Sequence, residues 1–119
     1  MIHMKIETLC VQEGYSPKNG EPRVLPIVQS TTYKYDSSDY MGKLFDLEES
    51  GFFYTRIGNP TAAAVEKKIA ALEGGVGAML TSSGQAATMA AVMNIANAGD
   101  NIVCSAACYG GTFNLLGVT

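Results

Sequence analysis

The 119-residue sequence has no tryptophan, a single histidine and only three cysteines. Cys10, Cys104 and Cys108 form an odd and sparse set, which excludes a disulfide framework and is typical of reduced thiols in the cytosol. Cys104 and Cys108 are four residues apart and could form half of a zinc site. A zinc tetrad would still be incomplete, because His3 is the only histidine and there is no second cysteine pair. We therefore expect no metal site, and interpret the cysteines as buried or incidental thiols.

Charge is also scarce, because charged residues make up 16% of the sequence, against roughly 25% in typical soluble proteins. The formal net charge is −3 and no basic run is longer than Lys67-Lys68, which excludes a nucleic-acid-binding surface. No apolar run approaches the roughly 20 residues that span a membrane, and no signal peptide is predicted. We expect a cytoplasmic protein with much of its surface covered by further chain or by a partner.

Residues 1–58 have weak hydrophobic periodicity and scattered prolines, and we expect an irregular arm with short pieces of structure. A helix is predicted over residues 4–12. Residues 24–35 are rich in β-branched side chains and are expected to be extended. Residues 36–38 offer an N-cap for a short helix over residues 39–44.

From Asn59 onward the local signals agree with one another. Asn59 as N-cap and Pro60 at the first helical position begin a predicted half-buried helix, which Gly74 ends. The pattern then predicts, in chain order, a strand, an uncharged helix, a second strand and a last helix, over residues 76–81, 85–97, 101–105 and 109–116.

This order indicates an α/β fold with a mainly parallel sheet. The helix over residues 85–97 has no charged side chain, so we expect it to be buried on most sides. Two parallel strands cannot form a sheet that buries such a helix. The sequence is therefore predicted to be the first part of a larger α/β domain, which is incomplete in this chain.

A candidate ligand site follows the first predicted strand, at Ser82-Ser83-Gly84-Gln85. Ligands bind at the carboxyl ends of strands in open α/β sheets, and the free N–H groups of a helix N-terminus suit a phosphate. Gly84 would let a backbone approach closely. The alternative is a simple serine N-cap. No P-loop, dinucleotide-binding glycine motif or nucleophile elbow is present.

Tyr54-Thr55-Arg56 precedes the capped helix and is a second candidate. An arginine can bind a phosphate with its planar fork, and a tyrosine can add a hydroxyl donor. The alternative is a surface arginine beside a packed tyrosine. Tyr109 follows the second predicted strand, where its ring would either stack on a planar ligand or cap the core.

Three motifs in order resemble the pyridoxal-phosphate enzymes of cysteine and methionine metabolism: YTRIGNPT at residues 54–61, SSGQAA at residues 82–87 and YGGTF at residues 109–113. Residues 7–9 and 26–33 also look like the N-terminal segment of that family. The resemblance implies the start of a PLP-dependent transferase (fold type I) large domain over residues 59–119. It also implies that residues 1–58 form an N-terminal arm that contacts a neighbouring subunit.

The resemblance also implies roles for individual residues. Gly84 and Gln85 would give backbone N–H groups to the phosphate of pyridoxal 5′-phosphate. Tyr54 and Arg56 would bind the same phosphate in the neighbouring subunit of a dimer. Tyr109 would stack over the pyridine ring near the substrate, as the catalytic candidate that helps the γ-leaving group to depart.

Gln85 after Gly84, with Gly110-Gly111 after Tyr109, looks most like the O-acetylhomoserine sulfhydrylase branch. That branch implies γ-replacement on an amino-acid substrate, in which sulfide or a thiol replaces acetate to give homocysteine or methionine, in a cytoplasmic homotetramer built as a dimer of dimers. A methionine or cystathionine γ-lyase, a cystathionine γ-synthase and a non-catalytic assembly module stay open as alternatives. No lysine matches the family's Schiff-base position, so we expect this chain alone to be inactive.

Overall fold

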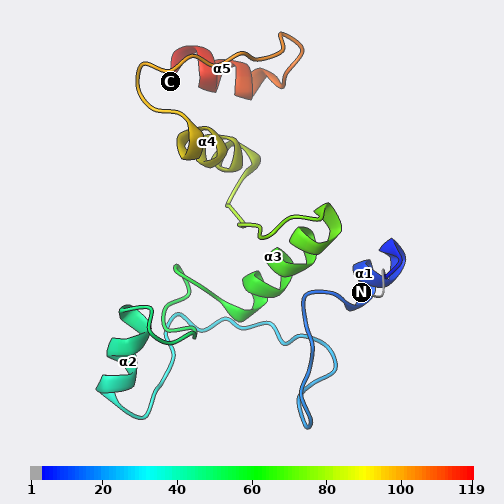
Figure 1. Cartoon of the computed structure of the whole chain (residues 1–119), viewed down its shortest axis with the longest axis vertical. Helices are drawn as coiled ribbons and strands as arrows, with labels where there is room; N and C mark the ends of the chain where they lie inside the picture. The colour runs from blue at the N-terminus through cyan, green and yellow to red at the C-terminus, as the bar shows by residue number, and fades with distance from the viewer. Residues whose placement is uncertain (1–3) are drawn as a thin grey trace. The chain divides into compact units, whose positions relative to one another are not determined.

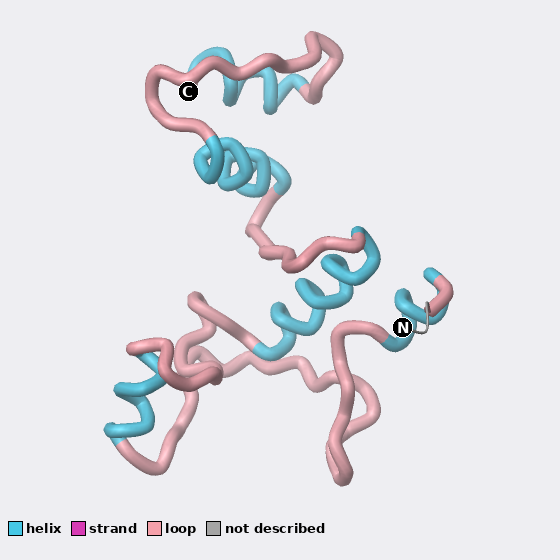
Figure 2. Tube along the Cα trace, in the orientation of Figure 1, coloured by secondary structure: helices cyan, strands magenta, loops and turns pink. Residues whose placement is uncertain are grey.

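The computed structural model describes residues 4–119 (Figure 1). This part of the chain contains the helices α1 (Ile6–Gln12), α2 (Ser38–Phe45), α3 (Pro60–Glu73), α4 (Gly84–Ile95) and α5 (Gly110–Val118). Loops connect them (Figure 2). The β-pairing within residues 4–119 is one isolated antiparallel bridge between Thr32 and Tyr54. The chain divides into two compact units between Met79 and Leu80.

In the first unit, α1 packs against α3. Gly14 follows α1 with a φ of 92°, in the left-handed region that glycine adopts without strain. Gly14 lies so close to α3 that an added Cβ would overlap the carbonyl oxygen of Ala64 and come within 3.2 Å of the Lys68 Cβ. The Lys68 ammonium also donates a hydrogen bond to the carbonyl of Cys10, at 3.0 Å. Close backbone approach and one side-chain bond thus join the two helices.

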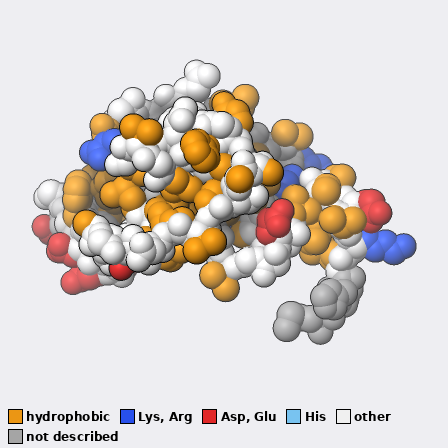
Figure 3. All heavy atoms as spheres, turned by 90° about the horizontal axis from the view of Figure 1, so that it is seen from above, with side chains coloured by type: hydrophobic (Ala, Val, Ile, Leu, Met, Phe, Trp, Pro, Cys, Tyr) orange, Lys and Arg blue, Asp and Glu red, His pale blue; other side chains and the backbone are white. Residues whose placement is uncertain are grey.

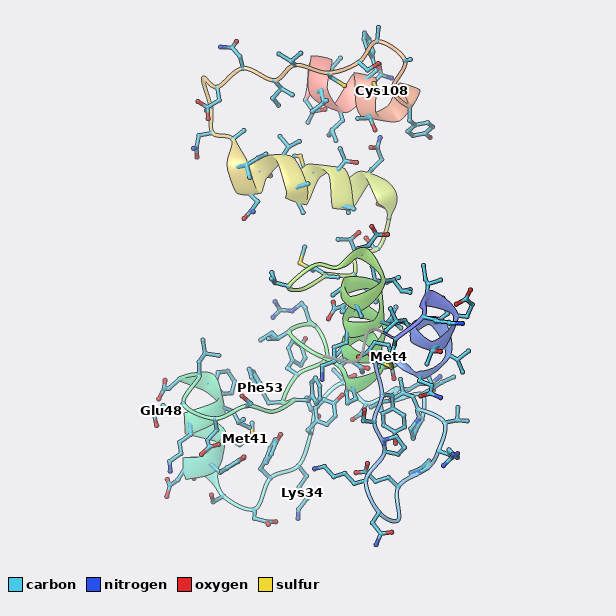
Figure 4. The ribbon with its side chains drawn as sticks, turned by 45° about the vertical axis from the view of Figure 1, so that its right-hand side comes forward. Met4, Lys34, Met41, Glu48, Phe53 and Cys108 are labelled. Carbon is cyan, nitrogen blue, oxygen red and sulfur yellow. The ribbon has the colours of Figure 1, made fainter. Side chains whose placement is uncertain are left out.

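A small apolar cluster fixes α2. Ser37 caps the helix by accepting a hydrogen bond from the Tyr40 N–H, as the sequence predicted. Leu44 is the most buried large side chain of the described residues, with 1% of its surface exposed. Phe53 lies beside α2 (Figure 4), and its ring centroid is 4.5 Å from that of Phe45. The cluster therefore anchors α2 to the chain segment that follows it.

The predicted limits of α3 are confirmed. The Asn59 side chain accepts a hydrogen bond from the Thr61 N–H, Pro60 occupies the first turn, and Gly74 ends the helix in the left-handed conformation, with a φ of 66°. Ala64 and Ala70 are the buried residues of this helix. The helix therefore has capped ends and, in the part of the chain that the structure describes, buries only these two alanines.

The second unit contains α4 and α5, which contact each other. Ser83 caps α4 by accepting from the Ala86 N–H at 3.1 Å. A turn after α4 is closed by Asp100, whose carboxylate accepts from the Asn97 N–H at 2.7 Å and whose own N–H donates to the Asn97 carbonyl at 3.0 Å. This turn ends α4 at Ile95, before the predicted residue 97.

The two predicted strands are not formed. Residues 76–81 and 101–105 are irregular, and Val76 and Val103 are fully exposed. A parallel strand exists only through hydrogen bonds to a neighbouring strand, and no described residue provides that neighbour. Residues 24–35, expected to be extended, contribute Thr32 to the isolated bridge and form no longer strand.

The uncharged helix predicted over residues 85–97 corresponds to α4. The prediction that it is buried is wrong for this chain, because no residue of α4 is buried. Large hydrophobic side chains of the second unit are exposed instead, among them Met93, Ile95, Phe113 and Val118. Figure 3 shows many hydrophobic side chains at the surface. No helix within residues 4–119 is long and apolar enough to cross a membrane.

Candidate functional site

Tyr54 and Arg56 lie on one tight turn at the end of the first unit's irregular segment. The Tyr54 carbonyl accepts hydrogen bonds from the N–H groups of Ile57, at 2.9 Å, and Gly58, at 3.0 Å. The exposed Arg56 folds back over Tyr54, with its guanidinium carbon 5.1 Å from the ring centroid. The structure thus brings these two predicted site residues together.

Asn59 holds the base of this turn. The residue is 7% exposed, and its side chain accepts a hydrogen bond from the Thr61 N–H at 2.8 Å. Its amide nitrogen lies 3.0 Å from the Val28 carbonyl oxygen, 3.2 Å from the Thr55 hydroxyl and 3.4 Å from the Tyr33 hydroxyl. The sequence predicted the capping bond only. The other three partners are distant in sequence or lie in the turn itself, and no local pattern signals them.

Two threonines extend this network to the 26–33 segment. Thr55 donates its N–H to the Thr31 carbonyl at 2.9 Å, and its hydroxyl donates to the Ser30 carbonyl. The Thr61 hydroxyl accepts from the Val28 N–H at 2.9 Å and donates to the Pro26 carbonyl at 3.3 Å. Both flanks of the Tyr54 turn are therefore bound to a segment about thirty residues earlier in the chain.

In the second unit, Gly84 and Gln85 occupy the first two positions of α4 and are exposed. The N–H groups of the first turn of a helix have no partner within the helix. Ser83 satisfies one of them by accepting from Ala86, and the Thr81 hydroxyl bonds the Ser83 carbonyl at 2.8 Å. No atom lies within 4 Å of a Cβ placed on Gly84. The start of α4 therefore offers N–H donors that the helix itself leaves unbonded, in the arrangement that binds anions.

Gln85 and Tyr109 meet at Gly111. A Cβ added to Gly111 would overlap the Gln85 side-chain nitrogen and lie 2.6 Å from the Tyr109 Cε1 atom. Tyr109 precedes α5 and is 76% exposed. The missing Cβ of Gly111 thus leaves a cradle into which the phenol ring and the carboxamide fit. Tyr54 and Arg56 belong to the first unit, whereas Gly84, Gln85 and Tyr109 belong to the second.

The thiols of Cys104 and Cys108 interact beside Tyr109. A hydrogen bond with the Cys104 thiol raises the pKa of Cys108, and the lesser causes are desolvation and the charge of Cys104. A turn brings them together, since the Cys108 N–H donates to the Ser105 carbonyl at 3.2 Å. Cys10 and Cys104 are exposed and Cys108 is half-buried, so of the two interpretations, buried or incidental thiols, burial is wrong for Cys10 and Cys104. Residues 4–119 contain no cluster of three potential metal ligands, and His3 lies outside the described residues.

The first unit also contains a cavity of about 780 Å³. It lies between the end of α1, the loop that follows and α3, and its lining includes Gln12, Tyr15, Arg23, Val65 and Lys68. None of the five predicted site residues lines it. The cavity is therefore separate from the residues that the sequence assigned to a ligand.

Comparison with known proteins shows one family. Residues 7–119 match the sequence model of a family described as Cys/Met metabolism PLP-dependent enzyme. The O-acetyl-L-homoserine sulfhydrylase of Leptospira meyeri is 46% identical over 118 residues, which are 98% of this chain and 27% of that protein. The homocysteine synthase of Schizosaccharomyces pombe is 46% identical over 114 residues, 95% of this chain and 27% of that protein.

A solved structure has the same fold. The putative O-acetylhomoserine (thiol)-lyase of Campylobacter jejuni, determined with N′-pyridoxyl-lysine-5′-monophosphate, matches with a TM-score of 0.89 and 34% identity. The match covers 98% of this chain and 29% of that one. The chain thus spans between a quarter and a third of the length of these relatives. The fold class expected from the sequence is confirmed by this similarity.

Proposed function

The chain belongs to the Cys/Met metabolism PLP-dependent enzyme family, and from that premise we propose that it acts as the N-terminal part of an O-acetylhomoserine sulfhydrylase. The reaction would replace the acetate of O-acetylhomoserine by sulfide or a thiol, and form homocysteine or methionine in the cytoplasm. The names of the relatives from Leptospira meyeri and Schizosaccharomyces pombe support this branch. The proposed organisation is an arm over residues 1–58 and the first part of the cofactor-binding domain over residues 59–119.

The chemistry of the donor groups fits the phosphate of pyridoxal 5′-phosphate. At the start of α4, the backbone N–H groups of Gly84 and Gln85 have no partner within the helix, and the helix dipole favours an anion there. Pyridoxal 5′-phosphate, when bound, supplies an electron sink for carbanion chemistry. The chain's own contribution is to bind the phosphate and to orient the ring, for which the Gly111 cradle offers the exposed Tyr109.

Tyr54 and Arg56 would complete the phosphate site of a neighbouring subunit. Within the described residues Arg56 forms no salt bridge, and its guanidinium is exposed above the Tyr54 ring. An unpaired planar cation on a fixed turn is suited to a bidentate contact with a phosphate. This arrangement requires at least a dimer, and we propose a dimer of dimers.

Tyr109 is the proposed catalytic residue, because its ring would stack on the cofactor and its hydroxyl would lie near the leaving acetate. The second unit contains no lysine, and the lysines of the chain all precede it, at positions 5, 18, 34, 43, 67 and 68. Since the reaction needs a lysine that forms a Schiff base, we propose that residues 1–119 alone are inactive.

The single observation that carries the proposal is the exposed Arg56 above the Tyr54 ring, on a fixed turn, in a chain of this family. Its test is cofactor affinity in the protein expressed from its complete reading frame. Loss of a charge-assisted contact should weaken binding of pyridoxal 5′-phosphate in Arg56→Ala by about 10- to 100-fold. The matched control is Arg23→Ala, the other arginine of the chain, which should leave the affinity unchanged. Equal affinities in the two variants would contradict the role of Arg56.

Complementation tests whether the arm crosses between subunits. Arg56→Ala and Tyr109→Phe should each lose activity, but a hybrid dimer of the two would contain one site with both native residues. Mixing the variants under dissociating conditions should therefore restore homocysteine formation from O-acetylhomoserine and sulfide. No recovery in hybrids verified by native mass spectrometry would place both residues in the same subunit's site.

A separate assay distinguishes the reaction type. Release of 2-oxobutyrate from methionine, in place of γ-replacement, would assign a lyase.

A further inference from the structure

Asn59 does more than cap α3. A helix N-cap needs only a side-chain acceptor for a first-turn N–H, and the Asn59 oxygen meets that need by accepting from Thr61 at 2.8 Å. Serine, threonine or aspartate would serve equally well as this acceptor. The amide nitrogen of Asn59 is the half of the side chain that capping does not explain.

That amide nitrogen gathers three acceptors from two parts of the chain. The Val28 carbonyl, at 3.0 Å, and the Tyr33 hydroxyl, at 3.4 Å, belong to the early segment, and the Thr55 hydroxyl, at 3.2 Å, belongs to the turn. A capping hydroxyl has a single O–H donor, whereas the carboxamide accepts from Thr61 through its oxygen and directs two N–H donors, one of them shared, towards these three acceptors. Its burial, with 7% of the residue exposed, strengthens these bonds by excluding competing water.

Thr55 transmits this constraint, since it lies between Tyr54 and Arg56. Its hydroxyl and N–H are bound to the 26–33 segment, and the Tyr54 carbonyl closes the turn on the far side of Arg56. The backbone that carries both phosphate-binding candidates is thus fixed before any ligand arrives. Fixing a binding group in advance lowers the entropy that is lost on binding.

We propose that Asn59 is a positioning residue that holds the Tyr54–Arg56 turn in the geometry that binds a phosphate group. The inference rests on the proposed function, because it assigns the phosphate to the cofactor. It predicts that the donor half of Asn59 affects binding of the phosphate and leaves binding of the pyridine ring unchanged.

The test uses Asn59→Ser, which keeps a capping oxygen and removes the amide donors without adding charge. In the protein expressed from its complete reading frame, affinity for pyridoxal 5′-phosphate should fall about tenfold, while affinity for pyridoxal, which lacks the phosphate, should stay the same. Thr55→Val provides a second variant that leaves the cap of α3 intact and should show the same selectivity. Asn19→Ser, at an exposed asparagine, is the matched control and should change neither affinity.

A double-mutant cycle separates positioning from general loosening of the fold. Once Arg56→Ala has removed the phosphate contact, adding Asn59→Ser should cause no further loss of pyridoxal 5′-phosphate affinity, because both act through one contact. Additive losses, or equal losses for pyridoxal and its phosphate, would overturn the positioning role. Absence of pyridoxal 5′-phosphate binding by the wild-type protein would instead overturn the proposed function.

Discussion

Replacing Gly14 by alanine should loosen the packing of α1 on α3. The φ of 92° places Gly14 in the left-handed region, where an alanine costs roughly 1–2 kcal/mol. The new Cβ would also overlap the Ala64 carbonyl oxygen and press on Lys68, and such overpacking costs about 1–3 kcal/mol. Together the two costs lower the free energy of unfolding by about 2–5 kcal/mol. Alanine also reduces the conformational freedom of the unfolded chain, which offsets about 0.4–1 kcal/mol of this loss.

Gly20→Ala is the matched control for this substitution. Gly20 also has a positive φ, of 84°, but nothing lies within 4 Å of a Cβ placed there. Alanine at this position should therefore cost only the conformational part, about 1–2 kcal/mol before the same offset. The difference between the two variants isolates the contact of Gly14 with α3.

The assay is urea unfolding of both variants and the wild type, followed by circular dichroism at 222 nm. We expect Gly14→Ala to lower the free energy of unfolding by at least about 1 kcal/mol more than Gly20→Ala. Equal losses would show that the Gly14 loop moves away from α3 without cost, and would refute the close approach as a stabilising contact.

Two further substitutions test the second unit. Gly111→Ala should displace the Tyr109 ring and the Gln85 amide, since its Cβ would overlap them. In the protein expressed from its complete reading frame, turnover should fall by about 10- to 100-fold, and unchanged turnover would contradict the cradle. Cys104→Ala should speed alkylation of Cys108 at pH 8, because loss of the Cys104 hydrogen bond lowers the raised pKa of Cys108 towards its ordinary 9.0 and increases the thiolate fraction. Mass spectrometry after timed iodoacetamide treatment measures this rate, and equal rates in wild type and variant would speak against the thiol–thiol contact.

Local signals predicted the helices and their caps. Asn59, Pro60 and Gly74 define α3 by interactions within a few residues of each end, so the sequence alone was enough. The strands over residues 76–81 and 101–105 depend on pairing with chain that is distant in sequence, and the structure leaves Val76 and Val103 exposed. Apolar composition predicted the tendency to be buried, but it carries no information on which partner covers the segment.

The candidate site likewise combines local features that the sequence predicts with long-range contacts that it does not predict. Tyr54 and Arg56 are two residues apart, so their proximity followed from the sequence, and so did the position of Gly84 at the start of a helix. The Asn59 amide bonds groups as far as 31 positions away. No periodicity or turn motif encodes such contacts, which appear only when the fold brings the segments together.

The anchoring of the Tyr54 turn has a consequence for the loop over residues 33–53, which carries α2. Two contacts hold the ends of this loop together. One is the bridge between Thr32 and Tyr54, and the other joins the Tyr33 and Thr55 hydroxyls at 3.4 Å. Since doubling the length of a flexible loop costs only about 0.6 kcal/mol, inserted residues near the exposed Glu48 would leave the turn in place. This loop is therefore a place where a label or an added binding element can be introduced without moving Arg56.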